Sequence, residues 1–325
     1  MTQAITRRAL TLVAAPALPL ALSPSFAQAD YPNRAVRFVV PGPAGGAGDV
    51  LGRLVMERLS QRFGQPFTVE NRAGAGTNIG MTVVARAAPD GYTLGLASIA
   101  SNAVNRWLYR NLPFNPETDF SPIAMIALVP NLMVISPTVP AATVAEFIAW
   151  ARRNPVAFGS VGAGSSQHLA GAQFAQAAGL DMVHVAYTTN GAMATDVMEG
   201  RVQVLFQSIS AVAELARAGR VRPLAVTGEG RAPAFPEVPT LREAGLDIVS
   251  TGWFGVCGPA GVPETILQRL NEAMAEIVGA PEVQARIIAG GAVPKVTTRA
   301  EMAGFMAAES ARWRPVVAAT GLTVD

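Results

Sequence analysis

The chain has 325 residues, half of them hydrophobic, and its 25 basic and 23 acidic residues leave a formal net charge of only +2. This near-balance argues against non-specific binding to nucleic acids or to anionic membranes. A single cysteine, Cys257, excludes an intramolecular disulfide and a multi-cysteine zinc site. We expect its thiol to be a small buried apolar group. The length is sufficient for two domains, each with its own core.

The N-terminal residues have the pattern of a targeting segment. Arg7 and Arg8 precede an apolar run, which is followed by the small-residue sequence Ala-Gln-Ala that ends at Ala29. Such a pattern is typical of a secretory signal peptide, and the run is too short for an ordinary membrane span. We therefore expect residues 1–29 to be removed by cleavage after Ala29 and the mature chain to be exported to the periplasm. The paired arginines leave twin-arginine export open beside the general secretory route.

Short apolar runs alternate with helical periodicities along the rest of the chain. In chain order, the pattern predicts a strand at 35–40, a helix at 49–63, a strand at 67–70, a helix at 78–87, strands at 93–97 and 132–136, a helix at 144–154, a strand at 157–160, a helix at 168–178, strands at 183–185, 202–206 and 221–226, and a largely helical tail over 263–321 in at least three pieces. This alternation predicts an α/β fold with parallel sheets covered by helices on both faces.

A Gly/Pro-rich loop without any Lys or Arg joins the first predicted strand to the first predicted helix. The unpaired N–H groups at a helix N-terminus carry partial positive charge, so such a loop is a natural anion site. The candidate contacts are Pro43, Ala44, Gly45 and Gly46. The alternative is a tight turn in which glycines serve backbone geometry alone. We assign Asp49 to structure, because an acidic residue at a helix start usually caps it and would repel an anionic ligand.

A second strand–loop–helix unit follows the strand predicted at 157–160. Its loop combines backbone amides with two hydroxyls in Gly164, Ser165, Ser166 and Gln167. The serines could donate to a carboxylate or cap the following helix, and both roles are compatible. His168 is a minor candidate, since a lone histidine is more often a packing or hydrogen-bonding residue than a ligand contact.

Polar, uncharged side chains also follow three other predicted strands. In open α/β sheets, ligands bind beyond the carboxyl ends of the strands. The further candidate contacts are therefore Ser98, Ser101, Tyr187, Thr188, Thr189, Asn190 and Gln207. For Ser98 and Ser101 the alternative is a solvated turn.

Motifs for catalysis, metals and cofactors are missing from the sequence. Neither helix opens with a full G-x-G-x-x-G, no G-x-S-x-G elbow is present, and no His/Asp/Glu cluster has metal spacing. With only two histidines, general-base capacity is small. We expect no cofactor, no metal and no enzyme activity, and an exported α/β enzyme is the less favoured alternative.

Several short segments together resemble the Bug-type periplasmic receptors, the solute-binding components of tripartite tricarboxylate transporters. Each segment alone is a weak signal, but their order and spacing are specific. They are Tyr31-Pro32-Asn33-Arg34, Val40-Pro41-Gly42-Pro43-Ala44-Gly45-Gly46 with Asp49, Val69-Glu70-Asn71-Arg72-Ala73-Gly74-Ala75-Gly76, Pro89-Asp90-Gly91-Tyr92-Thr93-Leu94, Gly164-Ser165-Ser166-Gln167-His168-Leu169, His184-Val185-Ala186-Tyr187, Pro236-Glu237-Val238-Pro239-Thr240 and Trp253-Phe254-Gly255.

The resemblance implies a type II periplasmic-binding-protein fold, with two α/β lobes, a ligand cleft and two crossovers. Lobe 1 would comprise residues 30–130 plus 251–325, and lobe 2 residues 131–250, with closure on the ligand by hinge motion. The family captures a small carboxylate-bearing metabolite and delivers it to a membrane permease. A monomer is expected. The alternative within the same fold is a sensor subunit that reports the ligand to a membrane kinase.

The chain also departs from the family pattern. Gly42 stands where relatives usually have an aromatic residue, and Thr188-Thr189-Asn190 replaces a Lys-Gly pair after Tyr187. Gln207 stands where many relatives carry an acid, which weakens the case for an amine-bearing ligand. We expect Trp253 and Phe254 to serve core or hinge packing.

Overall fold

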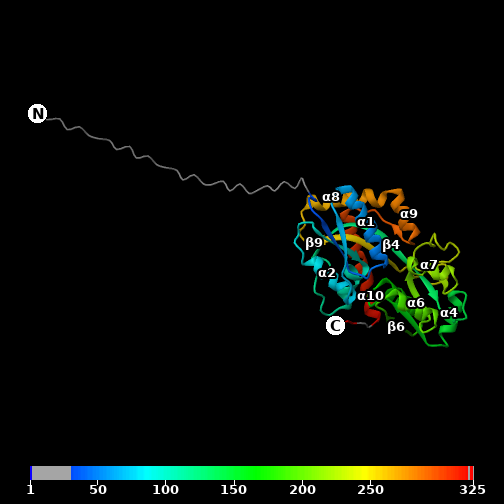
Figure 1. The fold of residues 1–325 in the computed structure, drawn as a ribbon. Coiled ribbons are helices and arrows are strands. Elements are labelled where there is room, and N and C mark those ends of the chain that lie inside the picture. The colour runs from blue at the N-terminus through cyan, green and yellow to red at the C-terminus, as the bar shows by residue number, and fades with distance from the viewer. Residues whose placement is uncertain (2–30, 321–322, 325) are drawn as a thin grey trace.

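The computed structural model describes Met1, residues 31–320 and residues 323–324. The predicted signal peptide, apart from Met1, therefore lies outside the described residues. Figure 1 shows a mixed β-sheet with helices on its faces, and the helices α8 and α9 lie at the opposite end of the body from α4 and α6.

The first group of strands contains two parallel neighbours and one antiparallel insertion. Its order is β2-β1-β3-β9-β4, and β10 pairs with β4. The strands β2 and β3 pair with β1 in parallel, whereas β9 is antiparallel to both β3 and β4. We call this set the first strand group: β1 (Val36–Val40), β2 (Phe67–Asn71), β3 (Thr93–Ser98), β9 (Thr251–Pro259), β10 (Val293–Pro294) and residues 120–130 of β4 (Phe120–Ile135).

The last five residues of β4 belong to a second strand group. They pair in antiparallel fashion with β7 (Val204–Ser208) and β8 (Arg222–Val226). The strand β7 continues in parallel to β5 (Val156–Ser160), which pairs with β6 (Met182–Ala186). The partners of β4 change at one point, since Pro130 faces Thr251 of β9 while Asn131 faces Ser208 of β7.

Two long strand segments escaped the sequence prediction. The strand predicted at 132–136 covers only residues 132–135 of the 16-residue strand β4, and none of β9 was predicted. Register shifts between Pro122 and Ala124 and between Met125 and Ala127 interrupt the alternation that identifies a strand. The strand β9 contains three glycines, which have low strand propensity. The expectation of parallel sheets was therefore wrong for the centre of the sheet, where these two strands make it mixed.

Helices cover both faces of the first strand group. On one face, α1 (Ala47–Phe63), α8 (Glu264–Gly279) and α9 (Pro281–Ala289) bury residues such as Leu54, Leu270 and Ile287 against Phe38. The other face packs Met81, Trp313 and their neighbours against Val39, from α2 (Asn78–Ala85), η3 (Ala100–Val104), α3 (Asn105–Leu108) and α10 (Arg299–Thr320). Phe38 and Val39 point to opposite faces because strand side chains alternate.

The second strand group has the same layered construction. The helices α4 (Val144–Ala151) and α5 (Ser166–Ala178) pack Phe147 and Phe174 against Met133. On the other face, α6 (Asn190–Met198) and α7 (Ile209–Arg217) pack against Leu132. The helical tail predicted over 263–321 consists of α8, α9 and α10, so its three-piece organisation is confirmed. Each strand group thus has a core on both faces.

Candidate functional site

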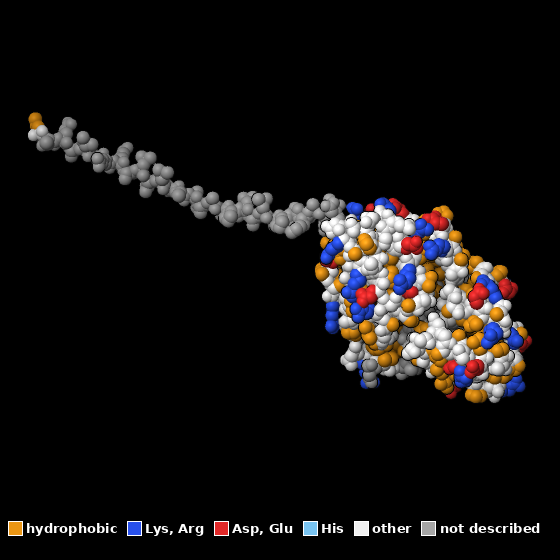
Figure 2. Space-filling view, in the orientation of Figure 1, with side chains coloured by type: hydrophobic (Ala, Val, Ile, Leu, Met, Phe, Trp, Pro, Cys, Tyr) orange, Lys and Arg blue, Asp and Glu red, His pale blue; other side chains and the backbone are white. Residues whose placement is uncertain are grey.

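A cavity of about 450 Å³ opens where loops from both strand groups meet. Its wall is built from the segments that follow β1, β2, β3, β5 and β6, together with the end of β7 and the start of β9. Figure 2 shows a hollow in the surface between the larger and the smaller part of the molecule. This is the position at which open α/β sheets bind ligands, beyond the carboxyl ends of their strands.

The loop from β1 to α1 forms one side of the cavity. The helix begins at Ala47, and Gly46 at its N-cap provides no side-chain cap. In the described part of the chain, the amides of Ala47, Gly48 and Asp49 have no hydrogen-bond acceptor. Pro43 and Gly46, both predicted contacts, line the cavity beside them. This side therefore presents the unpaired, positively polarised end of a helix.

Asp49 holds this loop in place. Its buried carboxylate accepts hydrogen bonds from the Gly45 amide at 2.9 Å and from Arg53 Nε at 3.0 Å. Asn71 Nδ2 is a third donor, at 3.0 Å. Burial by itself raises the pKa of Asp49, but the hydrogen bonds from Arg53, Gly45 and Asn71 outweigh it and leave the pKa below its usual value. The structural role predicted for Asp49 is confirmed, although the residue also forms part of the cavity wall.

Two predicted contacts in this loop do not line the cavity. Ala44 and Gly45 lie away from the cavity wall. The Gly45 amide, which the sequence suggested as a ligand donor, is already occupied by Asp49. Local sequence cannot show this, because it depends on how the first turn of the helix folds back over the loop.

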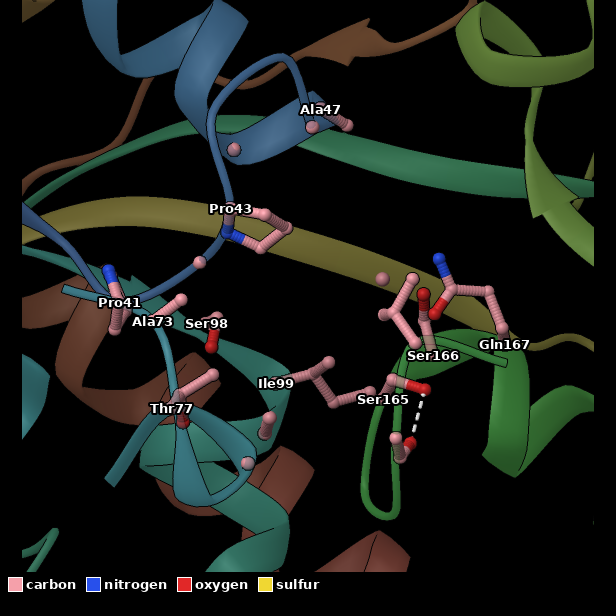
Figure 3. Close-up of a pocket in the computed structure, with 18 of the residues that line it drawn as sticks. Pro41, Pro43, Ala47, Ala73, Thr77, Ser98, Ile99, Ser165, Ser166 and Gln167 are labelled. Atoms are coloured by element: carbon pink, nitrogen blue, oxygen red, sulfur yellow. Dashed lines mark hydrogen bonds between the residues drawn. The ribbon is translucent and has the colours of Figure 1, made fainter. Parts of the chain in front are cut away.

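The loop from β5 to α5 faces the first loop across the cavity (Figure 3). Ser165 caps the helix, since its Oγ accepts from the His168 amide at 3.3 Å and donates to the Gly162 carbonyl at 2.7 Å. Ser166 and Gln167 line the cavity, and in the described part of the chain their amides and the Ser166 hydroxyl have no partner. These are three donors available to a ligand.

Gly164 does not reach the cavity wall. It has φ +77°, and a Cβ at this position would lie 2.9 Å from Asn105 Oδ1 and 3.2 Å from Leu108 Cδ2. The residue thus packs against the first strand group, and its amide donates to His168 Nδ1 at 3.2 Å. In this structure Gly164 contacts α3, and its contact with a ligand stays a prediction.

A third loop, which sequence reasoning did not name as a contact, lines the cavity on the side of the first strand group. Residues 73–77 line the wall, and two non-glycine residues within it have positive φ: Ala75 at +45° and Thr77 at +84°. Such conformations cost free energy and persist only where the surroundings impose them. Asn105 does so here, because its Nδ2 donates to the Gly76 carbonyl at 2.8 Å and to Asn78 Oδ1 at 2.6 Å. The Gly-Ala-Gly sequence was a signal that could have identified this loop.

A neutral amide network borders the cavity on the second strand group. Gln167 Nε2 donates to Gln207 Oε1 at 2.9 Å, and the Ser208 amide donates to the same oxygen at 2.7 Å. Gln207 Nε2 in turn lies 3.4 Å from Asn190 Oδ1. Gln167, Gln207 and Asn190 all line the cavity, as does Thr188. This wall offers amide dipoles and no charge.

Tyr187 contributes its ring to the cavity, but its hydroxyl is engaged elsewhere. The hydroxyl donates to Asp196 Oδ2 at 2.6 Å. Burial, and then this hydrogen bond, raise the pKa of Tyr187 to about 12. Thr189 caps α6 by accepting from the Ala192 amide at 3.3 Å and does not line the cavity, so its contact with a ligand stays a prediction.

Ser98 and Ser101 are separated by the structure. Ser98 lines the cavity, whereas Ser101 is fully buried behind it. The Ser101 hydroxyl lies 3.0 Å from Ser98 Oγ and donates to Asn102 Oδ1 at 2.6 Å. Ser101 therefore supports Ser98 from behind, and its direct contact with a ligand stays a prediction.

The remainder of the wall is apolar. It includes Leu96, Ile99, Val129, Val161 and Phe254, and Ile99 points toward Ser165 in Figure 3. Trp253, expected only in packing, is fully buried and also borders the cavity. Among the described residues of the wall, Asp49 is the one that carries a charge. An anion bound here would be held by peptide and side-chain dipoles.

The described residues contain no group of three or more His, Cys, Asp or Glu side chains placed to hold a metal ion. Cys257 is buried on β9, and burial raises the pKa of its thiol to about 12, as expected for an inert packing residue. Over the described part of the chain, helices are too short or too polar to cross a membrane.

The architecture and site define a solute-binding protein of the periplasmic-binding-protein class. R. palustris Rpa4515 with adipate is 36% identical, has a TM-score of 0.86, and matches over 90% of this chain and 99% of its own. MatC (Rpa3494) from Rhodopseudomonas palustris with bound malate is 29% identical, with a TM-score of 0.81 over 88% and 100% of the two chains. The α/β periplasmic-binding-protein fold expected from the sequence is confirmed.

The family model of the tripartite tricarboxylate transporter family receptor matches residues 51–322, and the chain belongs to this family. Protein BugT of Bordetella pertussis is 35% identical over 295 residues, which cover 90% of this chain and 90% of BugT. A UPF0065 protein of Bordetella bronchiseptica is 35% identical over 95% of this chain and 92% of its own. The resemblance to Bug-type receptors is thereby confirmed.

Proposed function

We propose that this protein is a periplasmic receptor that captures a small carboxylate-bearing metabolite and delivers it to the membrane permease of a tripartite tricarboxylate transporter. One observation carries the proposal: unpaired amides at the N-termini of α1 and α5 face one cavity from two strand groups. A carboxylate between them would satisfy donors that the described chain leaves unpaired. Family membership supports the same role.

The ligand class follows from the lining. The wall contains no guanidinium or ammonium group among the described residues, and most of it is apolar. The charge of Asp49 is already met by Gly45, Arg53 and Asn71, so no free acid remains for a ligand ammonium. We infer a carboxylate with an apolar body and no amine. The adipate bound to Rpa4515 belongs to this class.

Closure would occur between two lobes, residues 30–130 plus 251–325 and residues 131–250. The change of strand partners in β4 between Pro130 and Asn131 supports the first boundary, and the start of β9 at Thr251 supports the second. The two lobes would then rotate about few residues, as in hinge closure. Export with cleavage after Ala29 and a monomeric receptor complete the proposal.

The test begins with the protein as purified. Native mass spectrometry should reveal a retained organic acid, and a thermal-shift screen should show a higher melting temperature with adipate, by mass action on the folded state. The neutral diamide of adipate is the matched control and should have little effect. Lysine should also fail to raise the melting temperature. If no mono-, di- or tricarboxylate stabilises the protein and no acid is retained, the proposal is wrong. Delivery is tested by permease-dependent uptake in cells that lack or contain the receptor.

A further inference from the structure

The two histidines of the sequence lie against each other behind the β5–α5 loop. The ring centroids of His168 on α5 and His184 on β6 are 4.2 Å apart. Phe158 packs against both, with centroids 6.1 Å from His168 and 5.0 Å from His184. His168 is 2% exposed, and both rings lie away from the cavity wall. The sequence treated His168 as a lone histidine, and the fold corrects this.

The nitrogens of both rings hold the loop from behind. His168 Nδ1 accepts from the Gly164 amide at 3.2 Å. His184 Nε2 lies 2.7 Å from Ser160 Oγ, which accepts from the Gly162 amide at 3.0 Å and donates to the Gly162 carbonyl at 3.1 Å. Ser160 thus links the His184 ring to both polar groups of the Gly162 backbone.

On its other side, the same loop is confined by the helix α3. The space beside Gly164 is filled by Asn105 and Leu108, so the Gly164 peptide is held between α3 and His168. Two residues later, Ser166 and Gln167 present their unpaired amides to the cavity. A change in the Gly164 peptide would therefore change the direction of these donors.

We propose that His168 is a positioning residue for the ligand site: its unprotonated Nδ1 fixes the Gly164 peptide, and through it aims the amides of Ser166 and Gln167 and the Ser166 hydroxyl at the ligand. The inference rests on the proposed function for the ligand, but the contact with Gly164 does not. Without the acceptor, a buried N–H would lose its partner, which is more costly than a surface hydrogen bond.

The surroundings keep this ring neutral, so the acceptor is available. Burial, and then the neighbouring His184, lower the pKa of His168 to about 4, and burial lowers the pKa of His184. A positive charge in the first turn of a helix is also unfavourable. The strands that pack against α5 carry two titratable side chains, His184 on β6 and the buried Cys257 on β9, and Cys257 contributes to neither shift. The helix α10 packs there as well and carries Arg299, Glu301, Glu309, Arg312 and Arg314, and none of them contributes to either shift.

Three variants test the proposal near neutral pH. In His168→Asn the amide oxygen replaces Nδ1 as acceptor, whereas His168→Phe keeps a ring without an acceptor. Gln176→Ala, on the exposed side of α5, is the control. By calorimetry, His168→Phe should bind adipate about tenfold more weakly or worse, and His168→Asn within about threefold of the wild type. Circular dichroism checks that each variant is folded.

Amide exchange and nitrogen NMR provide readouts that do not need a ligand. Exchange of the Gly164 amide should accelerate in His168→Phe and remain slow in His168→Asn, and Nδ1 of His168 should be unprotonated. If His168→Phe leaves both this exchange and the affinity unchanged, the positioning role is refuted. If the wild type binds no carboxylate but the exchange behaves as expected, the loop contact stands and the proposed function fails instead.

Discussion

The two loops that face each other across the cavity are both fixed by a hydrogen bond from a glycine amide to a side chain, but the accepting side chains differ. In each, a glycine with positive φ, Gly45 at +74° or Gly164 at +77°, donates its amide to the side chain four residues later, in the first turn of the helix. In the first loop the acceptor is the Asp49 carboxylate, and in the second it is the His168 imidazole. The helix N-terminus is thus left open to the cavity while its own loop is fixed.

The difference lies in charge. Asp49 places a negative charge beside the free amides of α1 and needs Arg53 to offset it. His168 places a neutral ring behind the free amides of α5. The comparison suggests that the second loop is the stronger anion site of the two, because the described residues of that loop that line the cavity carry no negative charge to oppose a ligand carboxylate.

The largest effect is expected from Asp49→Ala. The substitution leaves the Gly45 amide, Arg53 and Asn71 without their shared acceptor. We expect the free energy of unfolding to fall by about 4 kcal/mol, because a buried charged acceptor is lost. Urea denaturation measures it. Asp49→Asn, which retains one oxygen, should lose clearly less, and equal losses for both variants would argue against hydrogen bonding as the cause.

Lowering the pH should remove the stability that the neutral His168 ring contributes behind the second loop. Unfolded His168 binds a proton below pH 6.5, whereas the folded protein takes it up only near pH 4. The free energy of unfolding should therefore decrease as the pH falls from 6.5 toward 4, with on the order of 3 kcal/mol from this residue. His168→Asn lacks this titration, so the difference between its pH profile and that of the wild type isolates the effect. Parallel profiles would contradict the buried, neutral ring.

The two glycines should respond unequally to alanine. Both have positive φ, which costs an alanine about 1 kcal/mol. A Cβ at Gly45 meets nothing within 4 Å, but one at Gly164 meets Asn105 at 2.9 Å. Gly164→Ala should therefore lose about 2 kcal/mol more stability than Gly45→Ala and should bind adipate more weakly. If Gly45→Ala proves the more harmful, the order is refuted.

The smallest effect should come from salt. The cavity wall holds a ligand by dipoles, since its described residues include no basic side chain. Affinity for adipate should change by less than about twofold between about 0.05 M and about 0.5 M salt. Calorimetry at several salt concentrations tests it. A steep decrease would indicate basic residues in the bound state and would contradict the dipole account of both loops.

Much of the fold could be predicted because its signals are local. The strand–loop–helix units around β1 and β5 follow from apolar runs, glycines and helical periodicity in adjacent residues. The prediction failed at β4 and β9, where bulges and glycines obscure the alternation and pairing between distant segments makes the strands. Local propensity is a weak guide in such places, because tertiary pairing overrides it.

The candidate site divides in the same way. Ten of the predicted contacts line the cavity: Pro43, Gly46, Ser98, Ser165, Ser166, Gln167, Tyr187, Thr188, Asn190 and Gln207. Their binding of a ligand remains a prediction. The others do not line the cavity, and three of them, Gly45, Gly164 and Ser101, form hydrogen bonds within the protein that hold the loops. Residues 73–77 were missed because Asn105, far along the chain, imposes their conformation.

By itself, the sequence determined the family, the α/β class and the loops that end its strands, since glycine content and periodicity act over a few residues. Only the tertiary structure decided which amides stay free. A donor is available to a ligand only when no other part of the chain accepts from it, and that depends on contacts such as Gly164 with His168, and on His184 meeting His168 from another strand. Hydrogen-bond satisfaction is a property of the packed chain, which no local pattern contains.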